Sequence, residues 1–233
     1  MHAEIVLAGP RKNAMSSEML RFLLERLREA GGAPALVRGE GDALSSGLDL
    51  REVASFRGEA EAFAFLKLLE DVFVAYYRHP APVVACVNGH AIAGGCVIAL
   101  CADWRVAQAN PAIKIGLNEV ARGIRFPPRT LALVADRLPL RHREEVILGA
   151  GLYAPADALR LGMVDEVSDD ALGAARRKME VLSALPRDAY AAVKTDLRKA
   201  LPYDAEAERL LREAMPFWTS DAFRPRLAAA LRK

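Results

Sequence analysis

Apolar residues recur at two different spacings in the first hundred positions, and these spacings predict alternating strands and helices. Short apolar runs of strand length occupy residues 4–8, 34–38, 83–87 and 103–107. Apolar residues at helical spacing predict one helix that begins at Ser16 or Ser17 and ends before Gly31, and a longer one over residues 59–78. Residues 40–47 are rich in polar and glycine positions and predict a loop. Strands that alternate with helices indicate an α/β fold.

The pattern changes after about residue 140, where helical spacing dominates. Helices are expected over residues 141–148, 154–161, 172–185, 187–201, 205–215 and 220–231. Pro186, Pro202 and Pro216 separate successive helices in this interpretation. We therefore expect residues 1–140 to form a strand-rich core that carries the site. Residues 141–233 are expected to form a helical C-terminal part that packs against other subunits and helps to close the site.

Composition and charge narrow the possible classes of protein. With 52% hydrophobic residues among 233, the chain can bury one sizeable core. The net charge of +2 demands neither nucleic acid nor a membrane as partner, and we expect neither. Cys86, Cys96 and Cys101 are odd in number and lack paired spacing, which argues against a disulfide framework and a zinc site. Buried, reduced thiols are expected instead.

Two observations lead us to expect a cytoplasmic location. The first predicted strand follows the N-terminus directly, with no signal-peptide pattern before it. Residues 83–102 are apolar and long enough to cross a membrane. However, Asn88-Gly89 is a turn signal and Gly94-Gly95 follows it, so we expect a buried strand, a turn and a helix there.

Two loops are candidates for binding chemistry, because each can present backbone N–H groups. They cover residues 44–50 and 88–96. In the second, Gly94-Gly95 opens a helix shortly after a strand, and such a helix N-terminus favours developing negative charge. Taken alone, the same glycines are equally explained by the steric needs of a tight turn.

Four segments, in the correct order, resemble motifs of the crotonase (enoyl-CoA hydratase/isomerase) family. They cover residues 9–16, 44–50, 82–107 and 153–165. The resemblance implies an α/β fold built as a crotonase-like stack of ββα units with a helical C-terminal part. It also implies an acyl-CoA thioester as partner and assembly as a homotrimer or homohexamer. No cofactor is expected, because coenzyme A is part of the substrate, and no metal.

The same resemblance assigns roles to residues of the two loops. In the family, two backbone N–H groups bind the thioester oxygen, and by motif position these are the amides of Leu48 and Gly94. Substrate contacts are assigned to Ser46, Gly47, Asp49, Gly95, Val97 and Lys12. For Asp49 a role in anchoring its loop is the favoured alternative, and for Lys12 a solvated position is the alternative.

Two positions suggest which reaction the site performs. Family hydratases hold a water with two glutamates, and the first of these positions is Val97 here, whereas Glu119 falls on the second. One carboxylate is what a 1,3-proton transfer needs. The segment 116–119 looks like that of mitochondrial-type Δ3,Δ2-enoyl-CoA isomerases, so we predict an isomerase of fatty-acid β-oxidation with Glu119 as catalytic base. Hydration, dehydration, thioester hydrolysis and non-catalytic acyl-CoA binding remain the alternatives.

Other polar residues receive less specific predictions. Asp103 lies between a helix and a strand, which favours a buried hydrogen-bonding role over chemistry. Arg122, Arg125 and the pair Pro127-Pro128 depart from the family's pattern after the glutamate. These departures leave the acyl-chain length open.

Overall fold

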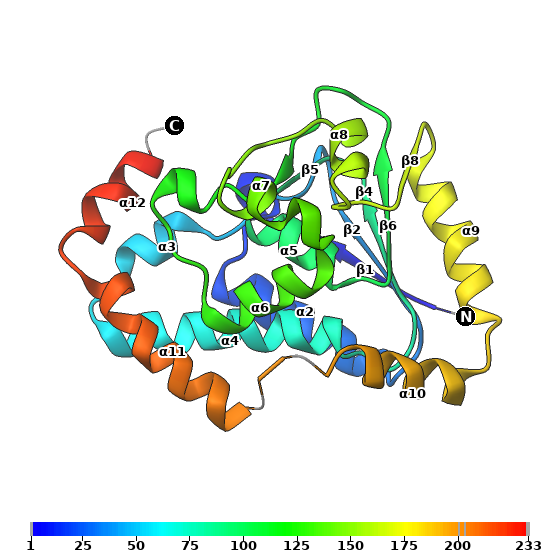
Figure 1. The fold of residues 1–233 in the computed structure, drawn as a ribbon, viewed down its shortest axis with the longest axis horizontal. Helices are drawn as coiled ribbons and strands as arrows, with labels where there is room; N and C mark the ends of the chain where they lie inside the picture. The colour runs from blue at the N-terminus through cyan, green and yellow to red at the C-terminus, as the bar shows by residue number, and fades with distance from the viewer. Residues whose placement is uncertain (1, 200, 203, 232–233) are drawn as a thin grey trace.

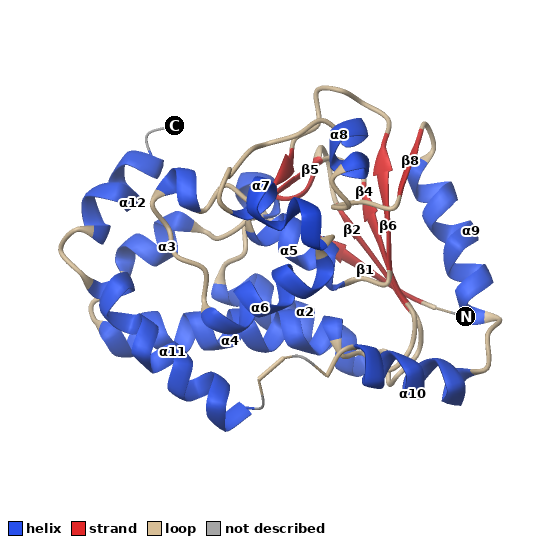
Figure 2. Ribbon diagram, in the orientation of Figure 1, coloured by secondary structure: helices blue, strands red, loops and turns tan. Residues whose placement is uncertain are grey.

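The centre of the protein is a five-stranded parallel sheet, seen in a computed structural model that describes residues 2–199, 201–202 and 204–231 (Figures 1 and 2). Its strands lie in the order β1 (Ala3–Leu7), β2 (Ala35–Gly39), β4 (Val83–Val87), β6 (Trp104–Gln108) and β8 (Glu166–Ser168). The first four confirm the strands predicted from the apolar runs. The fifth was not predicted, and it shows that the sheet draws on residues from both sides of position 140.

A smaller parallel sheet lies beside the first, and the residues that follow its strands line the candidate site. It contains β3 (Ala43–Ser45), β5 (His90–Ile92) and β7 (Ile115–Gly116). The prediction of a loop throughout residues 40–47 was therefore wrong. It failed because β3 is too short to show a periodic pattern. Each of these strands ends just before residues of the candidate site, and the carboxyl ends of parallel strands meet at one edge.

Helices surround both sheets. They are α1 (Pro10–Asn13), α2 (Ser17–Glu29), α3 (Leu50–Ser55), α4 (Glu59–Tyr77), α5 (Gly94–Cys101), α6 (Pro128–Arg137), α7 (Arg143–Ile147), α8 (Pro155–Arg160), α9 (Ala171–Ser183), α10 (Arg187–Leu197), α11 (Asp204–Thr219) and α12 (Phe223–Leu231). Two short 3-10 turns, η1 (Val120–Arg122) and η2 (Leu140–His142), connect some of them. The Ser16 hydroxyl accepts the N–H of Met19, which confirms the predicted cap of α2.

The prediction that Pro216 separates two helices was wrong. Helix α11 continues through Pro216 to Thr219. Proline removes one backbone donor, but Met215 and Trp218 on either side of it are buried. Their tertiary packing outweighs the local preference.

The two faces of the large sheet bury different clusters of side chains. Val83, Ala85 and Val87 of β4 join the main core, which includes α4 and α5. Val84 and Cys86, which alternate with them, join a second cluster beneath α9. Helix α9 therefore covers the outer face of the sheet, as Figure 1 shows.

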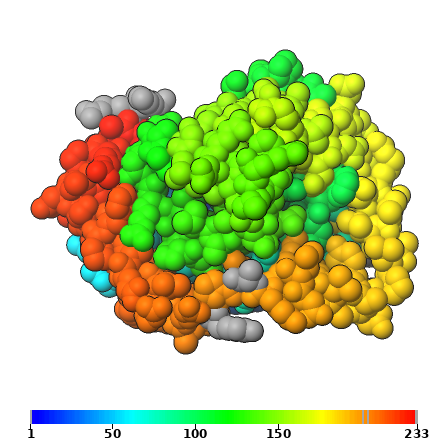
Figure 3. Space-filling model, in the orientation of Figure 1, coloured from blue at the N-terminus to red at the C-terminus, as the bar shows by residue number. Residues whose placement is uncertain are grey.

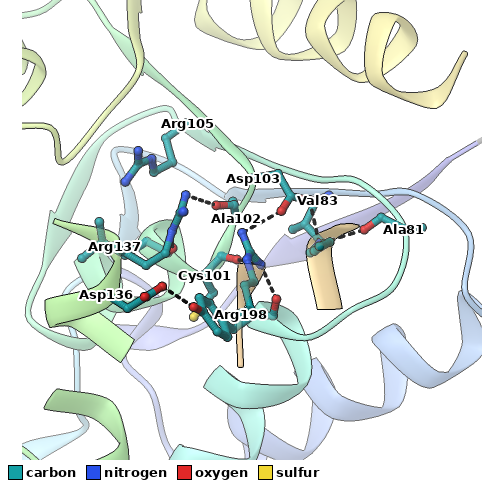
Figure 4. Close-up of polar contacts among 12 residues, drawn as sticks. Ala81, Val83, Cys101, Ala102, Asp103, Arg105, Asp136, Arg137 and Arg198 are labelled. Carbon is teal, nitrogen blue, oxygen red and sulfur yellow. Dashed lines mark hydrogen bonds and ion pairs between the residues drawn. The ribbon is translucent and has the colours of Figure 1, made fainter. Parts of the chain in front are cut away.

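A buried ionic network joins the C-terminal helices to this core (Figure 4). The Asp103 carboxylate accepts the Val83 N–H, the Lys194 ammonium and the Arg198 guanidinium, each at 2.7 Å. Arg137 donates to two carbonyls at the C-terminal end of α5. Burial lowers the pKa of Lys194 to about 8. The predicted hydrogen-bonding role of Asp103 is thus confirmed, and it ties α10 to the end of α5.

The apolar stretch at residues 83–102 forms the predicted strand and helix, β4 and α5, and between them the short strand β5, which was not predicted. None of the described helices combines the length and the apolar character that crossing a membrane requires. Cys86, Cys96 and Cys101 are buried free thiols, again as predicted.

Candidate functional site

A cavity of about 220 Å³ lies where the three strands of the small sheet end. Side chains from α4, from the segment after β7 and from the C-terminal helices complete its wall. The lining comprises Ser46, Leu48, Leu50, Leu69, Phe73, Ile92, Ala93, Gly94, Val97, Asn118, Glu119, Arg122, Ile124, Arg125, Phe126, Pro127, Thr130, Leu152, Trp218 and Ala230. Most of these side chains are apolar, which suits an acyl chain better than a sugar or a nucleotide.

The loop after β3 presents the backbone of Leu48 to this cavity. Met15 donates its N–H to the Gly47 carbonyl at 2.8 Å, and the Asp49 N–H donates to the Met15 carbonyl at 3.1 Å. This parallel bridge pairs Met15 with Leu48 and leaves the Leu48 N–H unused. The chain then turns into α3, whose first residue, Leu50, also lines the cavity.

The loop after β5 places the N-terminus of α5 beside the first loop. A Cβ added to Gly47, whose φ is +91°, would lie 2.9 Å from the Ala93 Cβ and 3.2 Å from the Gly94 nitrogen. Only glycine permits this approach of two backbones. Within the described residues, neither the Leu48 N–H nor the Gly94 N–H has an acceptor. Two free donors thus meet at one wall of the cavity.

The opening motif of the chain supports the first loop from behind. Arg11, Lys12 and Asn13 have φ values of 53°, 58° and 57°, which is uncommon for residues other than glycine. The buried Asn13 amide donates to the Ala43 carbonyl at 2.9 Å, and the Ser45 hydroxyl donates to the Asn13 carbonyl at 2.7 Å. These hydrogen bonds offset the strain and hold the loop in place.

The predicted binding residues fall into two groups. Among the residues assigned to the site, Ser46, Leu48, Gly94, Val97 and Glu119 line the cavity, and Gly47 abuts it. Asp49 instead caps α3 by accepting the Arg51 N–H at 3.1 Å, and it pairs with the Arg11 guanidinium. It is buried behind the loop, in the anchoring position that was the favoured alternative.

Gly95 and Lys12 are also placed outside the cavity lining. A Cβ at Gly95 would lie 2.1 Å from the Ser45 carbonyl oxygen, so this glycine allows α5 to pack against β3. The Lys12 ammonium lies 2.7 Å from the carboxylate of Asp42, and both side chains are about half exposed or more. A contact between Lys12 and a substrate stays a prediction.

Glu119 is the carboxylate of this cavity. It follows β7, and the N–H groups of Arg122 and Ile124 donate to its carbonyl at 3.0 and 2.8 Å, which fixes its backbone. Its side chain is buried, and Oε2 has no hydrogen-bond partner among the described residues. Burial raises the pKa of this carboxyl to about 8. A proton acceptor of this strength has one free oxygen available to a ligand.

Val97 faces the same cavity from α5, one turn after Gly94. Its side chain is 1% exposed and has no group that can donate or accept a proton. Within the described lining, Glu119 is the only carboxylate. The arrangement can therefore transfer one proton near two free N–H groups. A second carboxyl group, which holding a water would require, is replaced by the apolar side chain of Val97.

Several lining residues were not predicted to belong to the site. Leu69 and Phe73 were predicted only as the apolar face of the helix over residues 59–78, and periodicity does not distinguish a core face from a cavity wall. Thr130 lies at the start of α6, where the buried Glu70 carboxylate accepts its N–H at 3.0 Å. Burial raises the pKa of Glu70 to about 7. Trp218 reaches the cavity from α11, and its segment was predicted only to resemble the last helix of the family, with no role in the site.

Comparison with known proteins provides independent information. The enoyl-CoA hydratase/isomerase family model matches residues 3–221. Enoyl-CoA delta isomerase 1 of Mus musculus mitochondria is 35% identical over 158 residues, which cover 67% of this chain and 54% of the mouse protein. The chain thus spans about half the length of that relative. A probable enoyl-CoA hydratase of Mycolicibacterium paratuberculosis is 29% identical over 217 residues, or 91% of this chain and 83% of that protein.

A solved structure is similar over almost the whole chain. The crystal structure of human mitochondrial Δ3-Δ2-enoyl-CoA isomerase superposes with a TM-score of 0.89 and 26% sequence identity. The superposition covers 99% of this chain and 93% of the human one. The predicted fold class is confirmed by this similarity.

Proposed function

This chain belongs to the enoyl-CoA hydratase/isomerase family, and within it we propose that the protein shifts the double bond of a 3-enoyl-CoA to the 2-trans position. The proposal places the protein in fatty-acid β-oxidation, with an acyl-CoA thioester as its substrate. The observation that carries it is that the buried Glu119 is the one carboxylate in the described lining of the cavity, which it shares with Val97 and with the residues of the two free N–H groups, Leu48 and Gly94. The similarity to delta isomerases supports the same reaction.

In the proposed reaction, Glu119 acts first as a base. Its carboxylate removes a proton from C2 of the 3-enoyl thioester. The electrons of the broken C2–H bond form a C1–C2 double bond, and the carbonyl electrons move onto the thioester oxygen. The carbonyl then re-forms, the C1–C2 electrons become the C2–C3 double bond, and the electrons of the C3–C4 double bond take the proton back from the same carboxyl group at C4. The atoms balance with one proton and one side chain, so no water takes part.

The negative charge formed midway rests on the thioester oxygen. The N–H groups of Leu48 and Gly94 are the proposed donors to that oxygen, and they form an oxyanion hole. Such fixed dipoles stabilise developing charge without having to reorient, and each donor typically contributes about 3–4 kcal/mol. The raised pKa of Glu119 suits the proton transfer, because a stronger base removes a weakly acidic C2 proton more readily.

Hydration is the second candidate, because a probable enoyl-CoA hydratase is also a relative. The two reactions change the ultraviolet absorbance of the conjugated 2-enoyl thioester in opposite directions. Isomerisation of a 3-enoyl-CoA raises it, whereas hydration of a 2-enoyl-CoA lowers it. Release of free thiol would instead identify thioester hydrolysis, and binding without turnover would identify an acyl-CoA-binding protein.

The decisive experiment compares three proteins with trans-3-hexenoyl-CoA. They are the parent protein, Glu119→Gln and the control Glu144→Gln, which removes an exposed carboxylate of α7. We expect the absorbance to rise for the parent and the control, and the rate to fall by about 10²–10⁴-fold for Glu119→Gln. Full activity of Glu119→Gln, with binding intact, would refute the assigned base.

We further propose a homotrimer or homohexamer as the working assembly. Large apolar side chains are exposed on η2, directly after α7 and on α10, namely Leu140, Leu148, Val193 and Leu197. Light scattering coupled to gel filtration measures the assembled mass directly.

A further inference from the structure

A second cavity, of about 400 Å³, lies beside the candidate active site. It is bounded by α3, the first turns of α4, the end of α11 and α12, which gather at one end of the molecule (Figure 1). In the space-filling view, the orange and red residues of α11 and α12 pack directly against the green middle of the chain (Figure 3). The buried side chains of this second cavity are apolar: Val53, Ala62, Phe65, Leu66, Phe223 and Leu227.

The two cavities follow one another along the same helices. On α4, Leu66 lines the second cavity, whereas Leu69 and Phe73 line the site cavity. These residues are three and four positions apart, so they share one face of the helix. Helices α3 and α12 repeat the pattern, with Leu50 and Ala230 in the site cavity and their neighbours in the second.

Trp218 separates the two cavities. Within the described part of the chain, it is the one residue that lines both. Its indole is 6% exposed and meets the ring of Phe223 edge-on at 5.2 Å between centroids. The indole N–H is buried and has no acceptor among the described residues. The indole of Trp218, which we call the partition, is therefore held by packing, and replacing or displacing it costs no hydrogen bond.

We propose that Trp218 sets the longest acyl chain that this protein accepts. This inference rests on the proposed function, in which the acyl chain occupies the site cavity with its thioester at Leu48 and Gly94. A chain that extends past C4 follows the apolar face of α4 until it meets the indole. Beyond the indole lies the second cavity, whose buried side chains are apolar and can contact further methylene groups, and Trp218 is the described side chain that lines both cavities.

The test is a chain-length series of trans-3-enoyl-CoA substrates, from hexenoyl to hexadecenoyl. For the parent protein we expect kcat/KM to fall once the chain outgrows the site cavity. For Trp218→Ala we expect the ratio of kcat/KM for hexadecenoyl to that for hexenoyl to rise at least about tenfold. Trp218→Leu, which keeps more of the apolar packing, should change the ratio in the same direction.

A matched variant fills the second cavity instead of opening it. Ala228 lines that cavity from an exposed position on α12, so Ala228→Phe adds bulk there without disturbing the core. Combined with Trp218→Ala, it should reverse most of the gain for the long chain. An unchanged chain-length ratio in both Trp218 variants, with the parent active, would overturn the inference.

A second measurement keeps the indole intact. The chain has two tryptophans, and Trp104→Phe leaves Trp218 as the only fluorescent indole. We expect the emission of Trp218 to shift only with acyl-CoAs long enough to reach it, at the length where catalysis declines. If no 3-enoyl-CoA is isomerised but this length-dependent shift persists, the proposed reaction is wrong and the partition stands. If acyl-CoAs of every length bind by calorimetry and leave the emission unchanged, the partition is wrong.

Discussion

Replacing Glu119 with glutamine should make the stability of the protein less sensitive to pH. Burial raises the pKa of this carboxyl from 4.5 to about 8, so the folded protein holds the proton more tightly than the unfolded chain. Below pH 4.5 both states are protonated and the contribution is constant. As the pH rises from 4.5 to about 8, the unfolded chain releases its proton first, so the free energy of unfolding falls.

The size of this loss follows from the difference between the two pKa values. One pKa unit corresponds to about 1.4 kcal/mol, so the interval from 4.5 to about 8 corresponds to about 5 kcal/mol. The loss is complete above about pH 8 and reaches about 3 kcal/mol at pH 7. Glutamine carries no proton that can dissociate, so the variant does not suffer this loss. The proposed base therefore destabilises the parent protein at the pH where it works.

The assay is urea unfolding at about pH 5 and about pH 8.5, on either side of most of this interval. The free energy of unfolding should fall by about 4 kcal/mol less for Glu119→Gln than for the parent between these values. Glu70, whose pKa is raised to about 7, weakens both proteins equally over the same range and cancels in the comparison. The exposed control Glu144→Gln should follow the parent. An equal fall in the parent and in Glu119→Gln would refute the reasoning about burial.

Three further predictions follow from the same site and its supports. For the parent protein, kcat/KM for a 3-enoyl-CoA should rise about tenfold per pH unit and level off above about pH 8, because only ionised Glu119 accepts a proton; a flat profile would argue against it. Gly47→Ala should lower the isomerisation rate at least about tenfold, whereas Gly41→Ala, which has a positive φ but open space around it, should cost only about 1–2 kcal/mol of stability. Equal rates in these two glycine variants would show that the contact between the loops is unimportant. Asp103→Asn should lower the free energy of unfolding by about 3–5 kcal/mol, because two buried cations lose their counter-charge, and the midpoint of urea unfolding measures this.

Much of the fold could be predicted because long elements carry periodic signals. The helix over residues 59–78 repeats its apolar spacing over several turns, and the strand over residues 83–87 is an uninterrupted apolar run of strand length. The missed strands are short: β3, β5, β7 and β8 have three residues or fewer. Their positions depend on pairing with distant strands, which no local pattern reveals. The helices α3, with six residues, and α6, with ten, were also missed.

The site could be predicted only where a motif carried it. The two glycine-containing loops and Glu119 were predicted because each belongs to a short continuous segment that matches a segment of the family. Trp218 lies about one hundred residues away from Glu119 in the chain and reaches the cavity through the packing of α11. Its contribution depends on how helices pack rather than on any local sequence feature.

The proposed use of main-chain N–H groups as oxyanion donors has a consequence for how such a protein can change over generations. A substitution at Leu48 alters a side chain but leaves its N–H in place, since every amino acid except proline carries one. A single codon change at Glu119, by contrast, removes the proposed base completely. Charge stabilisation is therefore inherited with the shape of the backbone, while the choice of reaction depends on a few exchangeable side chains. The same scaffold can therefore acquire a different reaction while it keeps the proposed N–H donors to the thioester oxygen in place.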